Sequence, residues 1–301
     1  KATVQKVNMD NNQRSNIGYL GRASYSYDDR YFFTGSYRRD GASVFGVNQK
    51  WGDFFAFGGA WRLSSEKFMS SISYLDDLKL KLSWGKNGNQ GLDPYGTLST
   101  INNGASGGVR YEFGGSDIIY GLNQKALGNA NLGWETTESW NTGFESAWLG
   151  SRLFVDLDLY FSKTTDQIFT RDIPVMTGFK NMKSSMGQVN NRGVELTIRS
   201  VNIDTQDWYW TTNLTFWLNR NKLIHLYGED LDGDGREDDD ISNSRFIGKP
   251  LGAIYGYLQD GIVQETDVEY MKANGATPGI PKYKDMDNDG VITSADRIIL
   301  G

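Results

Sequence analysis

The stretch KDMDNDGVITSAD, residues 284–296, places hard oxygen donors at the spacing of a calcium-binding loop. Its candidate ligands, at positions 1, 3, 5, 7, 9 and 12 of a loop of the EF-hand type, are Asp285, Asp287, Asp289, the carbonyl of Val291, Thr293 and Asp296. Gly290 stands at position 6, where such a loop turns sharply. This pattern favours Ca²⁺ over Mg²⁺, which keeps its water ligands. The alternative is a turn held by its own Asp and Asn side chains.

A second acidic loop, EDLDGDGREDDD at 229–240, repeats the first half of this pattern. Its spaced carboxylates are Asp230, Asp232 and Asp234. Position 12 falls on Ile241, so the closing carboxylate is missing unless one of the three aspartates at 238–240 replaces it. A solvated acidic loop without a cation is the alternative interpretation.

The composition argues against most other chemistry. The 301 residues contain no cysteine and one histidine, His225, which excludes thiolate metal sites and most imidazole-based catalysis. Glu135 and Glu138 are available as a general acid and base, but nothing in the sequence fixes their separation. The net charge of −6 offers no basic stripe for a nucleic acid, so none is expected as a partner. We therefore expect that this protein is not an enzyme.

The segments that must position the loops alternate at the period of a β-strand. In LFVDLDLYFS, 153–162, Leu and Phe side chains fall on one face, whereas Asp156 and Asp158 fall on the other. Such a strand suits a barrel wall in which the apolar face meets lipid and the aspartates face a watery lumen, where they need no buried partner. A β-sandwich whose apolar face is a protein core is the alternative.

Eight segments of this kind are expected as strands, at 18–27, 31–39, 53–63, 77–86, 137–148, 152–162, 190–200 and 207–220. Their lengths cluster near the ~9–11 residues that a tilted strand needs to cross a bilayer. Short connections (28–30, 64–76, 149–151 and 201–206) alternate with long ones (40–52, 87–136 and 163–189), although 64–76 is not shorter than 40–52. This alternation is typical of outer-membrane barrels, which have short periplasmic turns and long extracellular loops.

Several motifs resemble the SusC-like TonB-dependent outer-membrane transporters. Residues 27–69 are similar to a stretch in which an Arg-Asp-Gly-x-Ser-x-Phe-Gly motif precedes an aromatic strand and a Trp-Arg-(Ile/Leu)-Ser-x-Glu turn. The segments at 85–96, 129–145 and 189–198 resemble its Gly-x-x-Gly-Asn-Gln loop, Asn-x-x-Leu-x-Trp-Glu strand and Asn-x-Gly-Val-Glu strand. Two closing-loop motifs follow, so at least six motifs stand in the family's order.

The resemblance implies an all-β protein, an antiparallel up-and-down transmembrane barrel of which this chain supplies about eight of 22 strands. We expect residues 1–220 to form part of the wall and 221–301 a long extracellular loop region. The plug domain, the TonB-box segment and the other strands are expected elsewhere in a longer polypeptide. A ninth spanning strand at 253–262 would place the second acidic loop in the periplasm, but the resemblance favours local loop structure there, with both acidic loops outward.

The implied function is TonB-dependent import of a glycan or peptide oligomer across the outer membrane, with a SusD-like surface lipoprotein as partner. Tyr95, Tyr111 and Tyr120, in the long connection, are candidates for stacking on sugar rings. Two other classes stay open. One is a secreted calcium-dependent binding or adhesion module, which would be soluble without detergent, and the other is a glycoside hydrolase, which would turn over oligosaccharides.

Overall fold

The computed structural model describes residues 11–103, 110–111, 119–179 and 181–300. The chain divides into two compact units, Lys1–Gly228 and Glu229–Gly301. Each unit is described by itself below.

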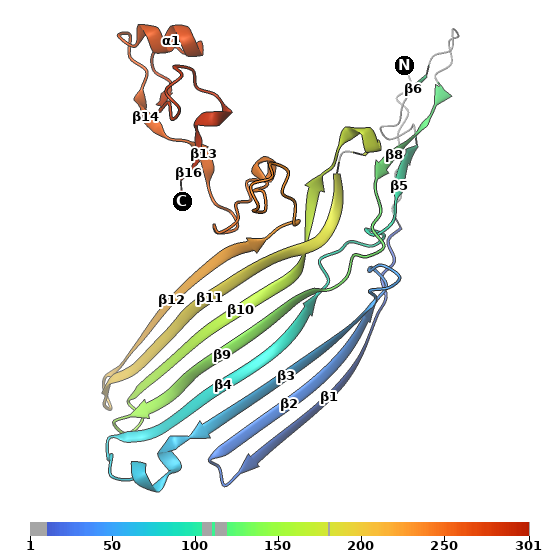
Figure 1. Ribbon diagram of the computed structural model, residues 1–301. Helices are drawn as coiled ribbons and strands as arrows, with labels where there is room; N and C mark the ends of the chain where they lie inside the picture. Colours follow the sequence, from blue (N-terminus) through green and yellow to red (C-terminus); the bar gives the residue numbers. More distant parts are fainter. Residues whose placement is uncertain (1–10, 104–109, 112–118, 180, 301) are drawn as a thin grey trace, which may run out of the picture. The chain divides into compact units, whose positions relative to one another are not determined.

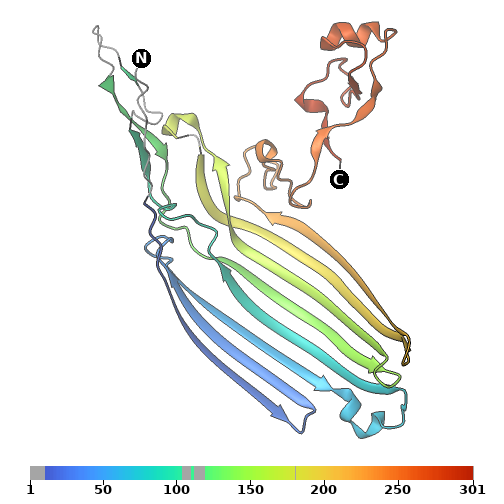
Figure 2. The same ribbon diagram turned by 180° about the vertical axis from the view of Figure 1, so that it is seen from behind.

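The first unit is dominated by one eight-stranded antiparallel sheet (Figures 1 and 2). Its strands are β1 (Asn16–Tyr27), β2 (Tyr31–Ala42), β3 (Trp51–Arg62), β4 (Leu75–Asn89), β9 (Glu135–Trp148), β10 (Leu153–Asp172), β11 (Asn181–Asp204) and β12 (Tyr209–His225). They follow one another in chain order across the sheet, and β1 and β12 are its open edges. The predicted up-and-down wall of eight strands is confirmed.

Alternating side chains explain why these segments form a sheet, but the hairpin of β10 and β11 continues beyond the alternation. The predicted long loop at 163–189 is wrong, because β10 runs on to Asp172 and pairs with β11 as far as Asn181. A bulge around Asp166, whose φ is 57°, shifts the register within this extension. Polar residues such as Thr164 and Ser185 lie in this part of the hairpin, where no apolar face is needed and the sequence shows no alternation.

The other connections keep their predicted character. Three short turns and the segment between Arg62 and Leu75 join the strands at one end, and this segment contains the 3₁₀ turns η1 (Leu63–Ser65) and η2 (Lys67–Met69). At the opposite end, the connection between β4 and β9 is the longest. It holds two small hairpins, β5 (Thr100–Asn103) with β8 (Leu122–Ala126) and β6 (Arg110–Tyr111) with β7 (Ile119–Tyr120). The turn η4 (Val175–Thr177) lies between β10 and β11.

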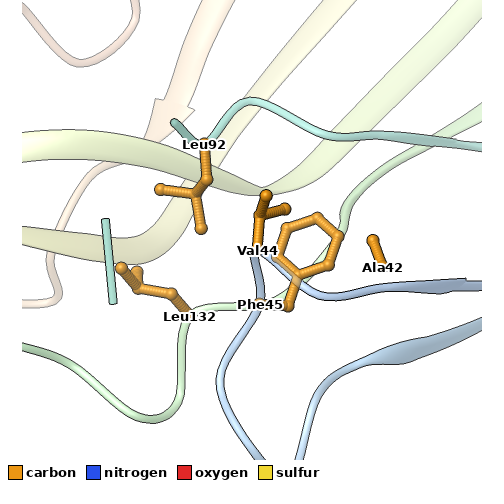
Figure 3. Close-up of a cluster of buried hydrophobic side chains, with 5 residues drawn as sticks. All are labelled: Ala42, Val44, Phe45, Leu92 and Leu132. Atoms are coloured by element: carbon orange, nitrogen blue, oxygen red, sulfur yellow. The ribbon is translucent and has the colours of Figure 1, made fainter. Parts of the chain in front are cut away.

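A small apolar core holds the connections together at the long-connection end of the sheet. Figure 3 shows its side chains, which come from the end of β2, the loop after it and the long connection: Ala42, Val44, Phe45, Leu92 and Leu132. Leu132 is fully buried, and burying a side chain of this size contributes about 1.5–3 kcal/mol. A residue larger than glycine at 46 would collide with the Ala130 carbonyl, since Gly46 N–H donates to the Leu132 carbonyl at 2.9 Å. The Phe-Gly motif therefore has a packing role.

The second unit contains short elements only. These are β13 (Tyr255–Tyr257), which pairs with β16 (Arg297–Ile299), β14 (Gln259–Ile262), which pairs with β15 (Pro281–Tyr283), the helix α1 (Val268–Asn274) and the 3₁₀ turns η5 (Ile241–Asn243) and η6 (Ser294–Asp296). Residues 253–262 thus form local structure, as the motifs favoured, and no ninth strand joins the large sheet within the described part of the chain. In that same part, no helix has both the length and the apolar character to span a membrane.

Candidate functional site

One face of the eight-stranded sheet carries a belt of apolar side chains, which we call the apolar belt. On β10 it comprises Leu153, Val155, Leu157, Leu159 and Phe161, the face that the sequence predicts. Strand register aligns Leu157 with the following neighbours on the same face: Trp61, Leu80, Phe144, Leu196 and Phe216. Leu82 and Phe216 are each 53% exposed and Leu214 is 57% exposed. Such an area open to water is costly, whereas lipid accommodates it.

Aromatic rings line the belt at its short-connection edge. Tyr31 stacks against both Tyr27 and Trp61, with ring centroids 6.5 and 6.2 Å apart, and Tyr74 stacks against Trp148 at 5.9 Å. Amphipathic rings at this position are typical of the interface between lipid and water.

At the opposite edge of the belt, a row of aromatic residues is followed by a row of charged residues. Trp84, Trp140 and Phe161 share one row across β4, β9 and β10. In the next row of the same face are Lys86, Glu138 and Lys163, and the Trp84 indole N–H donates to Glu138 Oε1 at 2.7 Å. On β10 the belt therefore covers 153–161, nine residues, which matches the ~9–11 residues of a spanning strand.

The belt is hollowed where Gly35 and Gly59 offer no side chain. A cavity of about 610 Å³ lies there, lined mainly by aromatic and small apolar residues, among them Phe33, Phe57 and Trp140. It lies on the apolar face, so we assign it to lipid contact and not to a cargo.

The other face of the sheet is polar, and a charged cluster stands at its centre. Lys81 Nζ lies 3.0 Å from Glu145 Oε1, 3.2 Å from Asp156 Oδ1 and 3.3 Å from Asp158 Oδ1. Lys79 Nζ lies 3.0 Å from Glu145 Oε2. We call these five residues the lysine–carboxylate cluster. The two aspartates are partly exposed and still have a partner, since register brings Lys81 to them from β4, two strands away. Glycine leaves room beside the cluster, because a side chain at 143 would meet the Asp158 carboxylate.

Near the long-connection end, the Arg38–Asp40 pair also faces away from the belt. Arg38 Nε lies 2.6 Å from Asp40 Oδ2, whereas Arg39, on the belt side, stacks over the Trp51 ring at 5.4 Å. Glu135 and Glu138 lie three residues apart on β9, so their side chains point to opposite faces. These two carboxylates therefore do not form an acid–base pair. His225 is the last residue of β12 and half-buried.

Trp134 and Glu135, the Trp-Glu pair of the Asn-x-x-Leu-x-Trp-Glu motif, lie at the centre of the packing at the long-connection end of the sheet. Trp134 lies against Phe45 and Phe54, with ring centroids 4.7 and 5.4 Å apart. Glu135 Oε1 accepts the Ile168 N–H at 2.9 Å, and its Oε2 accepts from the Asn89 amide at 2.8 Å. One motif thus connects β3, β4, β9 and β10 where the sheet passes into its long connections.

In the second unit, the carboxylates of the first acidic loop converge. One oxygen from each of Asp285, Asp287 and Asp289 lies within 4.8 Å of the others. Asp296 is fully buried and accepts hydrogen bonds from the Thr293 and Met286 N–H groups, both at 2.7 Å, which lower the pKa of its carboxyl. The Asp289 N–H lowers the pKa of Asp287, but burial and the charges of Asp289 and Asp296 outweigh it and raise that pKa. A cation would relieve this repulsion. Thr293 caps η6, and its hydroxyl accepts from the Ala295 N–H at 3.2 Å.

The second acidic loop recruits a different third carboxylate from the one expected. Asp230, Asp232 and Asp238 supply the oxygens that converge, whereas Asp234 accepts the Arg236 N–H at 2.8 Å. Asp238 is thus the one of the three aspartates at 238–240 whose carboxylate lies close to those of Asp230 and Asp232. Tyr95 is 48% exposed and has a φ of 63°. The side chains of Tyr111 and Tyr120 lie outside the described residues.

Comparison with known proteins gives consistent results. Residues 3–290 match the family model described as TonB dependent receptor-like, beta-barrel. "TonB-dependent receptor P3" of Formosa agariphila is 31% identical over 297 residues, which are 96% of this chain and 29% of that protein. "TonB-dependent receptor SusC" of Bacteroides thetaiotaomicron is 31% identical over 94% of this chain and 28% of that protein. The chain therefore spans less than a third of the length of these relatives.

Solved structures agree with this fold. The RagAB peptide importer in its 'open-open' state matches with a TM-score of 0.68 and 26% identity, over 84% of this chain and 26% of that chain. A second structure, of the RagAB peptide transporter, matches with a TM-score of 0.72 and 24% identity, over 93% of this chain and 28% of that chain. The second likeness concerns the fold alone.

Proposed function

The chain belongs to the TonB-dependent receptor β-barrel family, proteins of the outer membrane, and from this premise we propose that it forms part of the wall of an importer for an oligomeric nutrient. The observation that carries the proposal is the two-faced sheet. The apolar belt covers one face, and the lysine–carboxylate cluster with its polar neighbours covers the other. A wall with a water-compatible inner face suits passage of a hydrated cargo and performs no chemistry on it.

The inner face supports a polar cargo. A depression of about 370 Å³ lies there, lined mainly by small or polar residues such as Thr34, Ser36, Ser139 and Asn141. Side chains of this kind hydrogen-bond to amides and hydroxyls alike, so we propose a glycan or peptide oligomer. Tyr95 is a candidate aromatic contact at the long-connection end, where it lines a separate hollow of about 360 Å³. A SusD-like surface lipoprotein and TonB, with its energy, are the partners that we propose.

Uptake by cells tests this proposal. A strain that lacks the full-length gene is compared with the same strain complemented, and both are offered fluorescently labelled pools of oligopeptides and oligosaccharides. We expect the complemented strain alone to accumulate one of the pools, and a protonophore to stop the accumulation. Uptake that persists with the protonophore would contradict TonB dependence, and equal uptake by both strains from both pools would contradict the importer.

We also propose that the first acidic loop binds Ca²⁺. Support comes from the convergence of Asp285, Asp287 and Asp289, from the raised pKa of Asp287 and from Gly290, whose φ of 87° allows the sharp turn. The second loop is a weaker candidate of the same kind. The ion would brace a loop, so its removal should loosen structure without changing chemistry.

Isothermal titration of the full-length protein with CaCl₂ tests this site. We expect binding by the wild type, reduced binding by Asp285→Asn with Asp287→Asn, and unchanged binding by Asp76→Asn, which neutralises an aspartate in the first unit. Equal heats for the wild type and the double variant would show that the loop is an Asx-rich turn that binds no cation.

A further inference from the structure

Four cations gather on the belt side of the last three strands, at the long-connection edge. They are Lys163 on β10, Arg192 on β11, and Arg220 and Lys222 on β12, and we call them the basic patch. Each lies on the apolar face of its strand, just beyond the last apolar side chains of that face, which are Phe161, Val194 and Leu218.

Strand register brings the four charges together. Arg192 is directly opposite Arg220, and both Lys163 and Lys222 are directly opposite Asn190. Side chains that are directly or diagonally opposite lie within contact range, and like charges in such positions destabilise a sheet. An anion bound to the patch would therefore relieve the repulsion between its four cations.

The described residues place one carboxylate directly opposite a cation of the patch. None of them forms an ion pair with any of the four cations. Glu138 is directly opposite Lys163 and also accepts the Trp84 indole N–H, whereas none of the other three cations has a carboxylate directly opposite it. Three of the four side chains are exposed and Lys163 is half-buried, so an anion from outside can reach them.

The opposite edge of the belt differs in this respect. There, Arg30 lies 3.2 Å from Asp28 and 3.6 Å from Glu66. Arg30 thus has protein partners, whereas the cations of the basic patch face the level at which lipid headgroups begin.

We propose that the basic patch binds the phosphorylated headgroup of a membrane lipid in the leaflet on the long-connection side. Two guanidinium groups match the geometry of phosphate, and the ammonium groups add charge. The acyl chains of the same lipid lie on the apolar belt below, against Leu159, Phe161 and Leu218. The inference rests on the outer-membrane wall and not on the cargo, so it stands whether or not the proposed import is correct.

Native mass spectrometry of the full-length protein in detergent measures this binding. The probe is dioleoyl phosphatidic acid. Diolein has the same acyl chains without the phosphate, and inorganic phosphate serves as competitor. The test variant is Arg192→Gln with Arg220→Gln. The matched control, Arg22→Gln with Lys67→Gln, removes two cations from the inner face and the short-connection edge.

We expect the test variant to bind phosphatidic acid roughly 25-fold more weakly, since each cation near an anionic lipid surface contributes about a factor of five. The control should stay within about twofold of the wild type, since its cations lie on the inner face and at the opposite edge of the belt, away from the basic patch. Diolein should bind weakly to all proteins, and millimolar phosphate should displace little lipid.

Three results would overturn the inference. Equal affinity of the wild type and the test variant would show that the patch is not the binding site. A neighbouring strand of the full barrel that already neutralises Arg220 would give this same result. Tight binding of diolein would show that the phosphate is not recognised. Displacement of the lipid by inorganic phosphate would identify a site for a free anion. If the double variant does not assemble, Arg220→Gln alone replaces it, with an expected loss of about fivefold.

Discussion

Replacing Lys81 by methionine should destabilise the barrel, because this ammonium group joins three carboxylates on the inner face. The four side chains are partly exposed, Lys81 by 26% and its partners Glu145, Asp156 and Asp158 by 37–46%. A contact at this depth lies between the ~0.2–1 kcal/mol of an exposed ion pair and the ~1.5–3 kcal/mol of a charged hydrogen bond. At about 1 kcal/mol for each of three contacts, the expected loss is about 3 kcal/mol.

The measurement is the urea dependence of folding of the full-length protein into phospholipid vesicles, followed by the gel shift of the folded barrel. Lys79→Met is the matched control, because Lys79 contacts one carboxylate and its loss should cost about 1 kcal/mol. Adding Asp156→Asn and Asp158→Asn to Lys81→Met should recover part of the stability, since fewer carboxylates then lack a cation. The reasoning is refuted if Lys81→Met unfolds at the same urea concentration as the wild type, or if the added asparagines recover nothing.

Three further changes test other parts of the structure. Trp134→Ala should cost about 3–5 kcal/mol and expose the long connection to limited proteolysis; an unchanged digestion pattern would contradict the packing role. Leu157→Arg should cost about 2–4 kcal/mol of barrel stability, whereas Asp156→Asn should be tolerated, and equal stabilities in urea would contradict the lipid-facing assignment. Hydrogen bonds from Tyr31 and then from the Trp61 indole lower the pKa of Glu66. The stabilisation from its ionised form should therefore be present above the ordinary carboxyl pKa and be lost as the pH falls through the lowered value. A Glu66→Gln variant with the same acid dependence as the wild type would contradict it.

The sequence predicts the wall well because the belt imposes a strict period of two. Leu157 and Asp156 lie on the faces that the alternation assigns, and all eight strands are present. The prediction fails at 163–189, where β10 and β11 leave the level of the belt. There the strands still pair, but the hydroxyls of Thr164 and Ser185 hydrogen-bond to the Thr137 hydroxyl and the Asp166 carbonyl, so no hydrophobic alternation marks these residues.

Contacts set by register could not be predicted from the sequence. Lys81 reaches Asp156 from a strand 75 residues earlier in the chain, and only the order of the strands shows that the two meet. The sequence did contain a signal, since Lys79 and Lys81 alternate with leucines as the aspartates do, and opposite charges on one predicted face suggest a pair. The convergence of Asp285, Asp287 and Asp289 follows from their local spacing, whereas the approach of Asp238 to Asp230 and Asp232 depends on how the loop folds back.

The most direct test of the account is the environment of neighbouring side chains on β10. Nitroxide labels on single cysteines at 158 and 159 of the full-length protein, made cysteine-free elsewhere and placed in vesicles, report collisions with oxygen, which enriches in lipid, and with a water-soluble nickel chelate. We predict that the label at Leu159 collides mainly with oxygen and the label at Asp158 mainly with nickel. Similar ratios at both positions, or the reverse order, would show that the apolar belt does not face the bilayer.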